Sequence, residues 1–525
     1  MQTFMILFIL GVANGQFDTN AVGDRETIVQ LFSWKWTDVA LECERFLGPN
    51  GYGGVQVSPP NDHTIMNDPF RPWWERYQVA GYNLVSRSGD ENEFADMVER
   101  CNQANVRIYV DAVINHMAFF GGDSASGEPF NPDKLDYPTV PYTEEDFSVY
   151  YGLCNTTNQD ILNQSSVKEL RDCNLLALKD LAQHEERVRS NVAAYLNKMI
   201  DIGVAGFRLD AAKHMWPDDL ENIYGRLNEL KADHFEEGSK ALLYHEVIDK
   251  GQDPIRATEY THLGRVTEFN YGPLIVDCIR RHTPLKDFGR FNFAESWELL
   301  PSGEAVSFID NHDNQRGEGQ EEIVNFKEPK EYKMANALML AWPYGINRVM
   351  SSYEFETSDD GPPSNEDGDL LSPEIDEDGL CTGGWVCEHR WRVIKNMVKY
   401  QNVVRKESVT NWWDNGNQQV AFGRGKKGFF VMNNELEQNL TETIMTGLPQ
   451  GEYCNVILGE MTDGECSGPT VQVNSEGYAD FTIAFDSEEP MVAIHVDALV
   501  AGTGNVHVAS FVVILLAFLL SLSFI

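Results

Sequence analysis

The stretch Gly206-Phe207-Arg208-Leu209-Asp210-Ala211-Ala212-Lys213-His214 reads as a short strand that runs into a loop or helix. Side chains alternate along a strand, so Arg208 and Asp210 lie on one face, and Phe207 and Leu209 on the other. An arginine beside a carboxylate favours its ionised form near neutral pH. A carboxylate at a strand end is typical of the catalytic edge of a parallel barrel. A buried ion pair that only joins two elements is the alternative, and this stretch alone does not decide.

Two later stretches carry acids in the same way. Glu246 lies in Tyr244-His245-Glu246-Val247, and Asp313 lies in Phe308-Ile309-Asp310-Asn311-His312-Asp313. Each acid follows a short apolar run, and we expect Asp313 to end the seventh strand with Asn311 on the same face. Glycoside hydrolysis needs one carboxylate as nucleophile and one carboxylic acid as proton donor, and a third carboxylate orients the sugar. The sequence therefore offers three acids for this chemistry: Asp210, Glu246 and Asp313.

With Asp111-Ala112-Val113-Ile114-Asn115-His116 upstream, these stretches resemble the four signature segments of the alpha-amylase family of glycoside hydrolases, in order. The resemblance runs from about Gln16 to about Val496 and is to the animal type. It implies an endo-acting, retaining hydrolase of alpha-1,4-glucans such as starch and glycogen. Asp210 would be the nucleophile, Glu246 the general acid and base, and Asp313 the residue that binds the ring hydroxyls.

Two other functions remain open. An exo-acting alpha-glucosidase would use the same three acids and release glucose from chain ends. A catalytically silent, surface-bound relative would only bind a carbohydrate or a toxin. The presence of all three acids argues against a silent protein.

Strands and helices alternate along most of the chain, which predicts a TIM (β/α)8 barrel in the α/β class. We assign residues 16–116 and 181–416 to this barrel. Residues 117–180 are rich in Gly, Pro, Asp and Asn and are too long for a structureless loop, so we predict a small domain inserted after the third strand. Short strands with glycine turns follow, which predict a C-terminal antiparallel β-sandwich over 417–500.

Further substrate contacts are expected near the three acids. Two adjacent tryptophans cannot face one core, so a loop that displays them suits stacking on sugar rings, although it could instead clamp the barrel rim. In the resembled family such residues line the cleft. Histidines and a lysine beside the matched motifs would hydrogen-bond sugar hydroxyls. The predicted substrate-binding residues are Trp73, Trp74, Tyr77, His116, Lys213 and His312.

The resemblance also implies two ions. Calcium would take side-chain oxygens of Asn115 and Asp180 and the main-chain carbonyls of Arg171 and His214. Oxygen donors of this kind suit calcium, but without the resemblance they would read as ordinary loop residues.

Chloride is the second ion, and its predicted ligands are Arg208, Asn311 and Arg348. An anion here would disfavour the charged form of a neighbouring acid and so keep Glu246 protonated. The alternative is that Arg348 only pairs with a barrel carboxylate.

Nine cysteines in a secreted chain predict disulfides, whose pairing spacing alone does not give. The resemblance implies Cys43–Cys101, Cys154–Cys173, Cys381–Cys387 and Cys454–Cys466. Cys278 is left over as a buried thiol. Asn155, Asn163 and Asn439 stand in glycosylation sequons.

The charge balance limits the partners. The chain has 41 basic and 81 acidic residues, a net charge of −40, which would repel nucleic acid and anionic lipid. A neutral polysaccharide is not repelled, and the acidity also favours solubility. We expect a monomer.

Both termini carry targeting signals. Residues 1–15 read as a signal peptide, with an apolar run and a small-residue cleavage site. Residues 501–525 begin with Ala501-Gly502-Thr503-Gly504-Asn505 and end in an apolar tail from Val508, with no following Lys or Arg. This order predicts a glycosylphosphatidylinositol (GPI) anchor and a location on the outer face of the plasma membrane. A tail-end membrane helix, or a tail removed without lipid so that the enzyme is secreted, are the alternatives.

Overall fold

The computed structural model describes residues 16–290, 297–317 and 323–501. The predicted signal peptide, and the predicted anchor signal beyond residue 501, lie outside these ranges. The chain forms two compact units, and the boundary falls between Asn402 and Val403. In the described ranges no helix has the length and apolarity that a membrane crossing requires.

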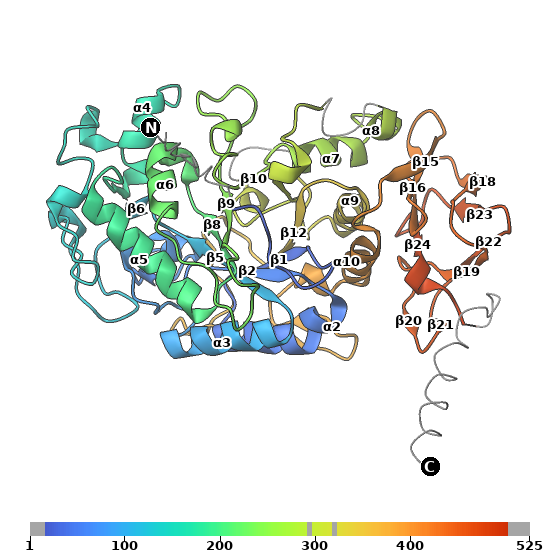
Figure 1. Ribbon diagram of the computed structural model, residues 1–525, viewed down its shortest axis with the longest axis horizontal. Coiled ribbons are helices and arrows are strands. Elements are labelled where there is room, and N and C mark those ends of the chain that lie inside the picture. Colours follow the sequence, from blue (N-terminus) through green and yellow to red (C-terminus); the bar gives the residue numbers. More distant parts are fainter. Residues whose placement is uncertain (1–15, 291–296, 318–322, 502–525) are drawn as a thin grey trace, which may run out of the picture. The chain divides into compact units, whose positions relative to one another are not determined.

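The first unit is built around a closed barrel of eight strands (Figure 1). Every neighbouring pair is parallel, which confirms the predicted TIM barrel. Most residues of these short strands are buried, because side chains fill the barrel on one face and helices cover the other. In order along the chain, the barrel strands are β1 (Ile28–Leu31), β2 (Gly54–Val57), β5 (Arg107–Ala112), β8 (Gly206–Leu209), β9 (Leu242–His245), β10 (Arg265–Thr267), β11 (Ala305–Ser307) and β12 (Ile346–Ser351).

Helices follow the strands and surround them (Figure 1). At the start of α3 (Glu91–Gln103), the Asp90 side chain accepts hydrogen bonds from the first-turn amides, and Glu93 accepts one from the Asp90 amide. Apolar residues three and four apart then turn one face to the barrel. The longer helices are α1 (Trp36–Glu42), α3 (Glu91–Gln103), α5 (Glu186–Ile202), α6 (Pro217–Tyr224), α7 (Tyr271–Ile279), α9 (Pro329–Ala341) and α10 (Arg392–Val404).

The segment after β11 differs from the sequence prediction. We expected Asp313 to end the seventh strand, but β11 ends at Ser307 and Asp313 lies in the turn that follows. The Asn314 side chain accepts a hydrogen bond from the Asn311 amide, and the Asn311 side chain accepts one from the Asn314 amide, both at 2.8 Å. These local bonds replace the strand ladder, as asparagine side chains often do.

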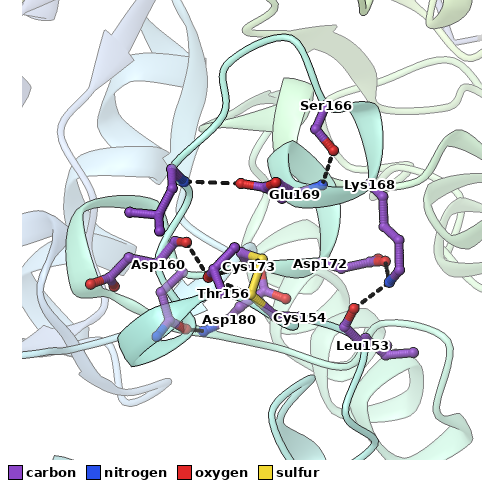
Figure 2. Close-up of a disulfide and its surroundings, with 12 residues drawn as sticks. Leu153, Cys154, Thr156, Asp160, Ser166, Lys168, Glu169, Asp172, Cys173 and Asp180 are labelled. Atoms are coloured by element: carbon purple, nitrogen blue, oxygen red, sulfur yellow. Dashed lines mark hydrogen bonds and ion pairs between the residues drawn. A yellow bond between two sulfur atoms is a disulfide. The ribbon is translucent and has the colours of Figure 1, made fainter.

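The insertion after the third barrel strand is closed by its own small ladder. Strand β6 (His116–Met117) pairs antiparallel with β7 (Lys179–Asp180), so the two ends of the insertion meet. Between them lie short helical turns and α4 (Val167–Asp172), and Cys154 is bonded to Cys173 (Figure 2). A short ladder and one disulfide thus hold a segment with little regular structure of its own.

The second unit is all-β and antiparallel. Apolar residues from its four-stranded sheet and from two of its two-stranded sheets share one buried core, in agreement with the predicted sandwich. The first strand of this unit begins before residue 417, where we predicted the unit to start. The prediction missed this strand because it has no fully buried residue and no clear alternation. The strands are β15 (Val409–Asp414), β16 (Gln419–Arg424), β17 (Gly428–Asn433) and β24 (Met491–His495) in one sheet, and the pairs β18 (Leu440–Met445) with β23 (Tyr478–Ile483), β19 (Gly451–Cys454) with β22 (Thr470–Val473), and β20 (Met461–Thr462) with β21 (Glu465–Cys466).

All four expected disulfides are present, and Cys278 is buried outside them. The sequon asparagines Asn155, Asn163 and Asn439 are exposed, as glycosylation would require.

Candidate active site

The barrel strands bring the signature residues to one end. Asp111 on β5 and Arg208 on β8 are register partners, so both side chains point into the barrel. The Asp210 amide donates to the carbonyl of Ala112, and the Glu246 amide donates to the carbonyl of Leu209. These main-chain bonds extend the barrel by one residue, which fixes both acids at the carboxyl ends of neighbouring strands.

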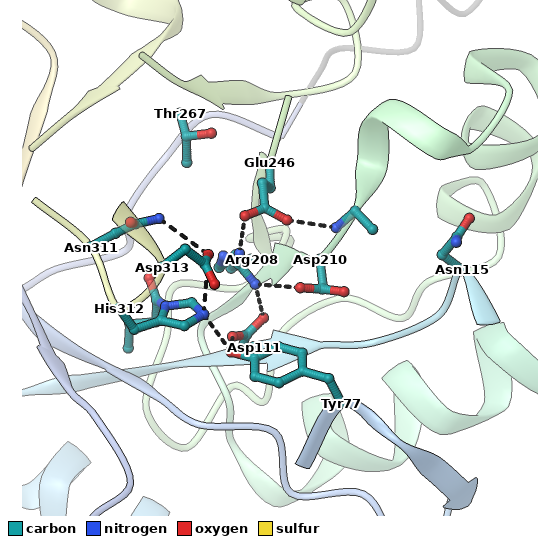
Figure 3. A network of polar contacts seen from close by, with 12 residues as sticks. Tyr77, Asp111, Asn115, Arg208, Asp210, Glu246, Thr267, Asn311, His312 and Asp313 are labelled. Carbon is teal, nitrogen blue, oxygen red and sulfur yellow. Dashed lines mark hydrogen bonds and ion pairs between the residues drawn. The ribbon is translucent and has the colours of Figure 1, made fainter. Parts of the chain in front are cut away.

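One guanidinium holds three acids (Figure 3). Arg208 Nη1 lies 2.9 Å from Asp210 Oδ1 and also bonds Asp111, while its Nη2 bonds Glu246 Oε1. The amide of Ala211 donates to Glu246 Oε2 at 2.8 Å. All three acids are less than a tenth exposed, so their charges interact strongly.

The pKa of Asp210 is set by opposing effects. Burial, and next the charge of Glu246, raise the pKa of Asp210 well above its ordinary value, although Arg208 opposes the shift. Burial also raises the pKa of Asp111 against the pull of Arg208. Arg208 therefore opposes the upward shift of the Asp210 pKa without cancelling it, because its one positive charge is shared among three acids.

Asp313 joins this cluster from the turn after β11. Its carboxylate lies 3.4 Å from His312 Nε2, and burial followed by the charge of Glu246 raises the pKa of Asp313 to about 7. Because its side chain is 29% exposed, solvent screens part of this effect. The turn thus brings the third predicted acid to the same end of the barrel.

His312 is held in one tautomer by its neighbours. Tyr77 donates its hydroxyl proton to Asp111 at 2.8 Å, so His312 Nε2, 3.0 Å from the same hydroxyl, must donate to it. Its Nδ1 then accepts from the Gln30 amide at 2.9 Å. Burial and nearby arginines lower the pKa of His312, so the ring is neutral and presents Nε2–H toward Asp313.

The aromatic loop forms the short helix η2 (Trp73–Tyr77). The rings of Trp73 and Tyr77 pack against His312 beside the acids. The indole nitrogens bond elsewhere, that of Trp73 to the Ser358 carbonyl and that of Trp74 to Asp359. The loop is therefore fixed to a neighbouring loop while its half-exposed rings remain beside the acids.

Two other predicted substrate contacts are engaged within the protein. His116 is buried, and its Nε2 lies 3.1 Å from the Tyr77 carbonyl, so it links the insertion to the aromatic loop. Lys213 donates to the Ile248 carbonyl at 2.6 Å and to Asp253 at 2.7 Å. Either residue would have to exchange a protein contact for a sugar contact.

The predicted calcium ligands meet where the insertion joins the barrel. Asn115 Oδ1 and both carboxylate oxygens of Asp180 are buried, and none has a hydrogen-bond partner among the described residues. The side chains of Arg171 and His214 bond Glu259 and the Leu170 carbonyl, so only their main-chain carbonyls would be available. Buried oxygens without donors fit a bound cation. Across the described residues, no three His, Cys, Asp or Glu side chains form a metal cluster, so a calcium ion here would need main-chain carbonyls among its ligands.

The predicted chloride ligands also lie close together. Arg208 and Arg348 are both buried, and their mutual repulsion helps burial to lower the pKa of Arg348. Arg348 donates to Gln56 at 2.9 Å and covers the Phe308 ring, and it has no ion pair with any described carboxylate. The alternative of a simple ion pair is thus not supported. Asn311 Nδ2 lies 3.5 Å from Asp313 Oδ2 at the same end of the barrel.

Asp111 belongs to the site although our sequence reasoning did not select it. It bonds both Arg208 and Tyr77. The signal was present, because Asp111 stands in the same signature segment as Asn115. Its role depends on the register between β5 and β8, which one sequence does not give.

Comparison with known proteins agrees with this geometry. The family model described as alpha amylase, catalytic domain, matches residues 55–354, and that of the alpha amylase C-terminal all-beta domain matches 410–497. The alpha-amylase of Oryzias latipes and the pancreatic alpha-amylase of Homo sapiens are each 48% identical over 95% of this chain and all of their own length. A crystal structure of a variant of alpha-amylase I from Eisenia fetida in complex with maltohexaose is 45% identical, with a TM-score of 0.87 over 92% of this chain and 99% of its own. The barrel, the all-β unit and these matches show that the chain belongs to the alpha-amylase family and is a glycoside hydrolase.

Proposed function

We propose that this protein cleaves internal alpha-1,4 bonds of starch-type glucans with retention of configuration. The observation that carries the proposal is the pair Asp210 and Glu246, held by one guanidinium at adjacent strand ends. Two carboxyl groups held close together suit nucleophilic attack, whereas an inverting enzyme needs room for a water between them. The maltohexaose complex of the Eisenia fetida relative supports an oligomeric glucan as substrate.

In the proposed reaction, Asp210 attacks the anomeric carbon while Glu246 protonates the leaving oxygen. Glu246 then takes a proton from water, which attacks the glycosyl ester and restores the alpha configuration. The competent state has its charge on Asp210 and its proton on Glu246. The contact of Arg208 with Asp210 stabilises that charge, and the ionised acids stabilise the cationic transition state.

The remaining residues bind and orient the sugar. Asp313 accepts hydrogen bonds from ring hydroxyls, and His312 Nε2 donates to a sugar hydroxyl in exchange for its contact with the Tyr77 hydroxyl. The rings of Trp73, Trp74 and Tyr77 stack on sugar faces, and His116 and Lys213 contact neighbouring units. Asp111 positions Arg208 from the barrel interior.

Digestion of amylose tests this function. An endo-acting enzyme releases maltose and longer alpha-configured oligosaccharides early in the reaction. Glucose as the only early product would instead identify the exo-acting alpha-glucosidase, and no turnover by folded protein would support a binding-only relative. The anomeric form of the first product, read by proton NMR, tests retention.

Calcium would bind Asn115 and Asp180 through side-chain oxygens, and Arg171 and His214 through carbonyls. It would neutralise Asp180 and join the insertion to the segment after Asp210. No chemical step depends on it directly.

Chloride would lie among Arg208, Asn311 and Arg348, where two buried cations otherwise repel each other. It would favour the protonated form of Glu246 between turnovers.

For location, the sequence of the C-terminal tail supports a GPI anchor on the outer face of the plasma membrane. Phosphatidylinositol-specific phospholipase C should release active enzyme from cells. Activity that detergent frees but the phospholipase does not would favour a membrane helix, and activity already in the medium would favour secretion.

A further inference from the structure

Arg76, in the aromatic loop, is a buried cation. Its side chain is among the largest that are fully buried, with 1% of the residue exposed. Neither Nη1 nor Nη2 has a hydrogen-bond partner within residues 16–290, 297–317 and 323–501. A guanidinium carries five N–H donors, and buried donors are almost always satisfied. Its two terminal nitrogens therefore call for a partner other than the described residues.

The adjacent carboxylate is already used by other residues. Glu75 Oε1 accepts from Arg71 at 3.0 Å and lies 3.4 Å from Arg87 Nη1, and Oε2 accepts from the Met66 amide at 3.2 Å. Arg87 is also bound by the carbonyls of Arg71 and Gly368. Two arginines thus share one carboxylate, and Arg76 is a third cation beside them.

Two neighbouring polar side chains, those of His63 and Asn61, carry no negative charge. His63 is fully buried, and burial together with the charge of Arg76 lowers its pKa to about 3, so it is neutral. Asn61 donates to the Arg76 carbonyl at 3.3 Å. Burial, and then the charge of Arg87, lower the pKa of Arg76 itself to about 9. Among the described residues, Glu75 is the one carboxylate that forms an ion pair with any of the three arginines Arg71, Arg76 and Arg87.

We propose that Arg76 binds a small monovalent anion, with chloride as the physiological occupant, through Nη1 and Nη2. The two terminal nitrogens of a guanidinium form a fork that suits such a ligand. This site lies in the loop of η2 and is built from other residues than the proposed chloride site at Arg208, Asn311 and Arg348.

An anion at Arg76 would stabilise the loop that carries the substrate contacts. Arg76 lies between Glu75, which anchors the loop, and Tyr77, which bonds Asp111 and contacts His312. Neutralising Arg76 would remove its repulsion with Arg87 and fix the backbone on either side. The expected consequence is tighter glucan binding, seen in KM more than in kcat.

Crystals grown with bromide in place of chloride test the site directly. We expect an anomalous peak within hydrogen-bond distance of Arg76 Nη1 and Nη2, and its loss in Arg76→Gln. Water alone at this position, at a bromide concentration that saturates other sites, would overturn the proposal. Bromide at Arg76 but not at Arg348 would refute the proposed chloride activation and leave this inference intact. If Arg76→Gln does not fold, the wild-type map alone decides.

Chloride dependence of the melting temperature gives a second test in solution. In the Arg348→Gln background, chloride should still raise the melting temperature, and adding Arg76→Gln should abolish that rise. Arg107→Gln is a matched control, because Arg107 is buried but bonds Asn20, Asn102 and His234. It should lower the melting temperature without changing the chloride dependence. An Arg348→Gln protein that is already indifferent to chloride would contradict a site at Arg76.

Discussion

Asp111 and Arg208 face each other on adjacent barrel strands and form a buried ion pair. Asp111 does not contact the bond to be cleaved. Through this pair, however, it sets the position of the Arg208 guanidinium, which holds both Asp210 and Glu246. Asp111 also accepts the hydroxyl proton of Tyr77. The strand register thus connects the acids to the aromatic loop.

Asp111→Asn should lower kcat roughly 10- to 100-fold, as is typical for residues that orient a functional group. The amide keeps the size of the side chain and an acceptor for Tyr77, but it no longer neutralises Arg208. Arg208 would then pair more strongly with Asp210 and Glu246, which should move the acid limb of the pH–rate profile to lower pH. A profile with an unchanged acid limb, or a change in KM alone, would contradict this role.

Asp210→Asn and Glu246→Gln should each reduce kcat by several orders of magnitude while the protein stays folded. Both substitutions keep the side-chain shape, so circular dichroism and the melting temperature serve as controls. Near-normal activity in either folded variant would show that the assignment of nucleophile and proton donor is wrong.

The barrel and the candidate acids could be predicted from local sequence, because each of the three acids follows a short apolar run within its own segment of the chain. Long-range geometry was not predictable to the same degree. The turn between Asn311 and Asn314 depends on side-chain bonds that a strand pattern conceals. Strand β15 was missed because it is only half-buried, so its sequence shows no alternation. The environment of Arg76 depends on which cations converge on Glu75, and spacing along the chain does not reveal that.

Removal of calcium should lower the melting temperature. A ligand that binds only the folded state stabilises it by RT ln(1 + [L]/Kd), about 2.7 kcal/mol at one hundred times Kd. Chelator should therefore destabilise the protein, and added calcium should restore it. Asp180→Asn should weaken this response, because it removes the buried charge that faces the ion. An unchanged melting temperature in metal-free protein, verified by elemental analysis, would exclude the site.

Removal of chloride should move the pH optimum to lower values, and so should Arg348→Gln. An anion beside the acids disfavours their charged forms, so without it they lose protons at lower pH. Sulfate at matched ionic strength controls for general screening. A pH–rate profile that is the same with and without chloride would count against the proposed site.

Glu388 should make the protein less stable as pH rises toward neutrality. It is fully buried, one carboxylate oxygen accepts from the Ser352 amide at 2.6 Å, and the other has no partner among the described residues. Burial raises the pKa of Glu388 to about 7, so the folded state binds a proton that the unfolded state releases above its ordinary value of 4.5. Between these two values the unfolding free energy should fall with rising pH, by about 3 kcal/mol in total.

Glu388→Gln should remove this slope in urea unfolding measured from pH 5 to 8. The control Glu44→Gln alters an exposed carboxylate whose pKa is lowered by Arg100, so it should leave the slope unchanged in this range. If Glu388→Gln and wild type lose stability in parallel as pH rises, another buried acid carries the proton.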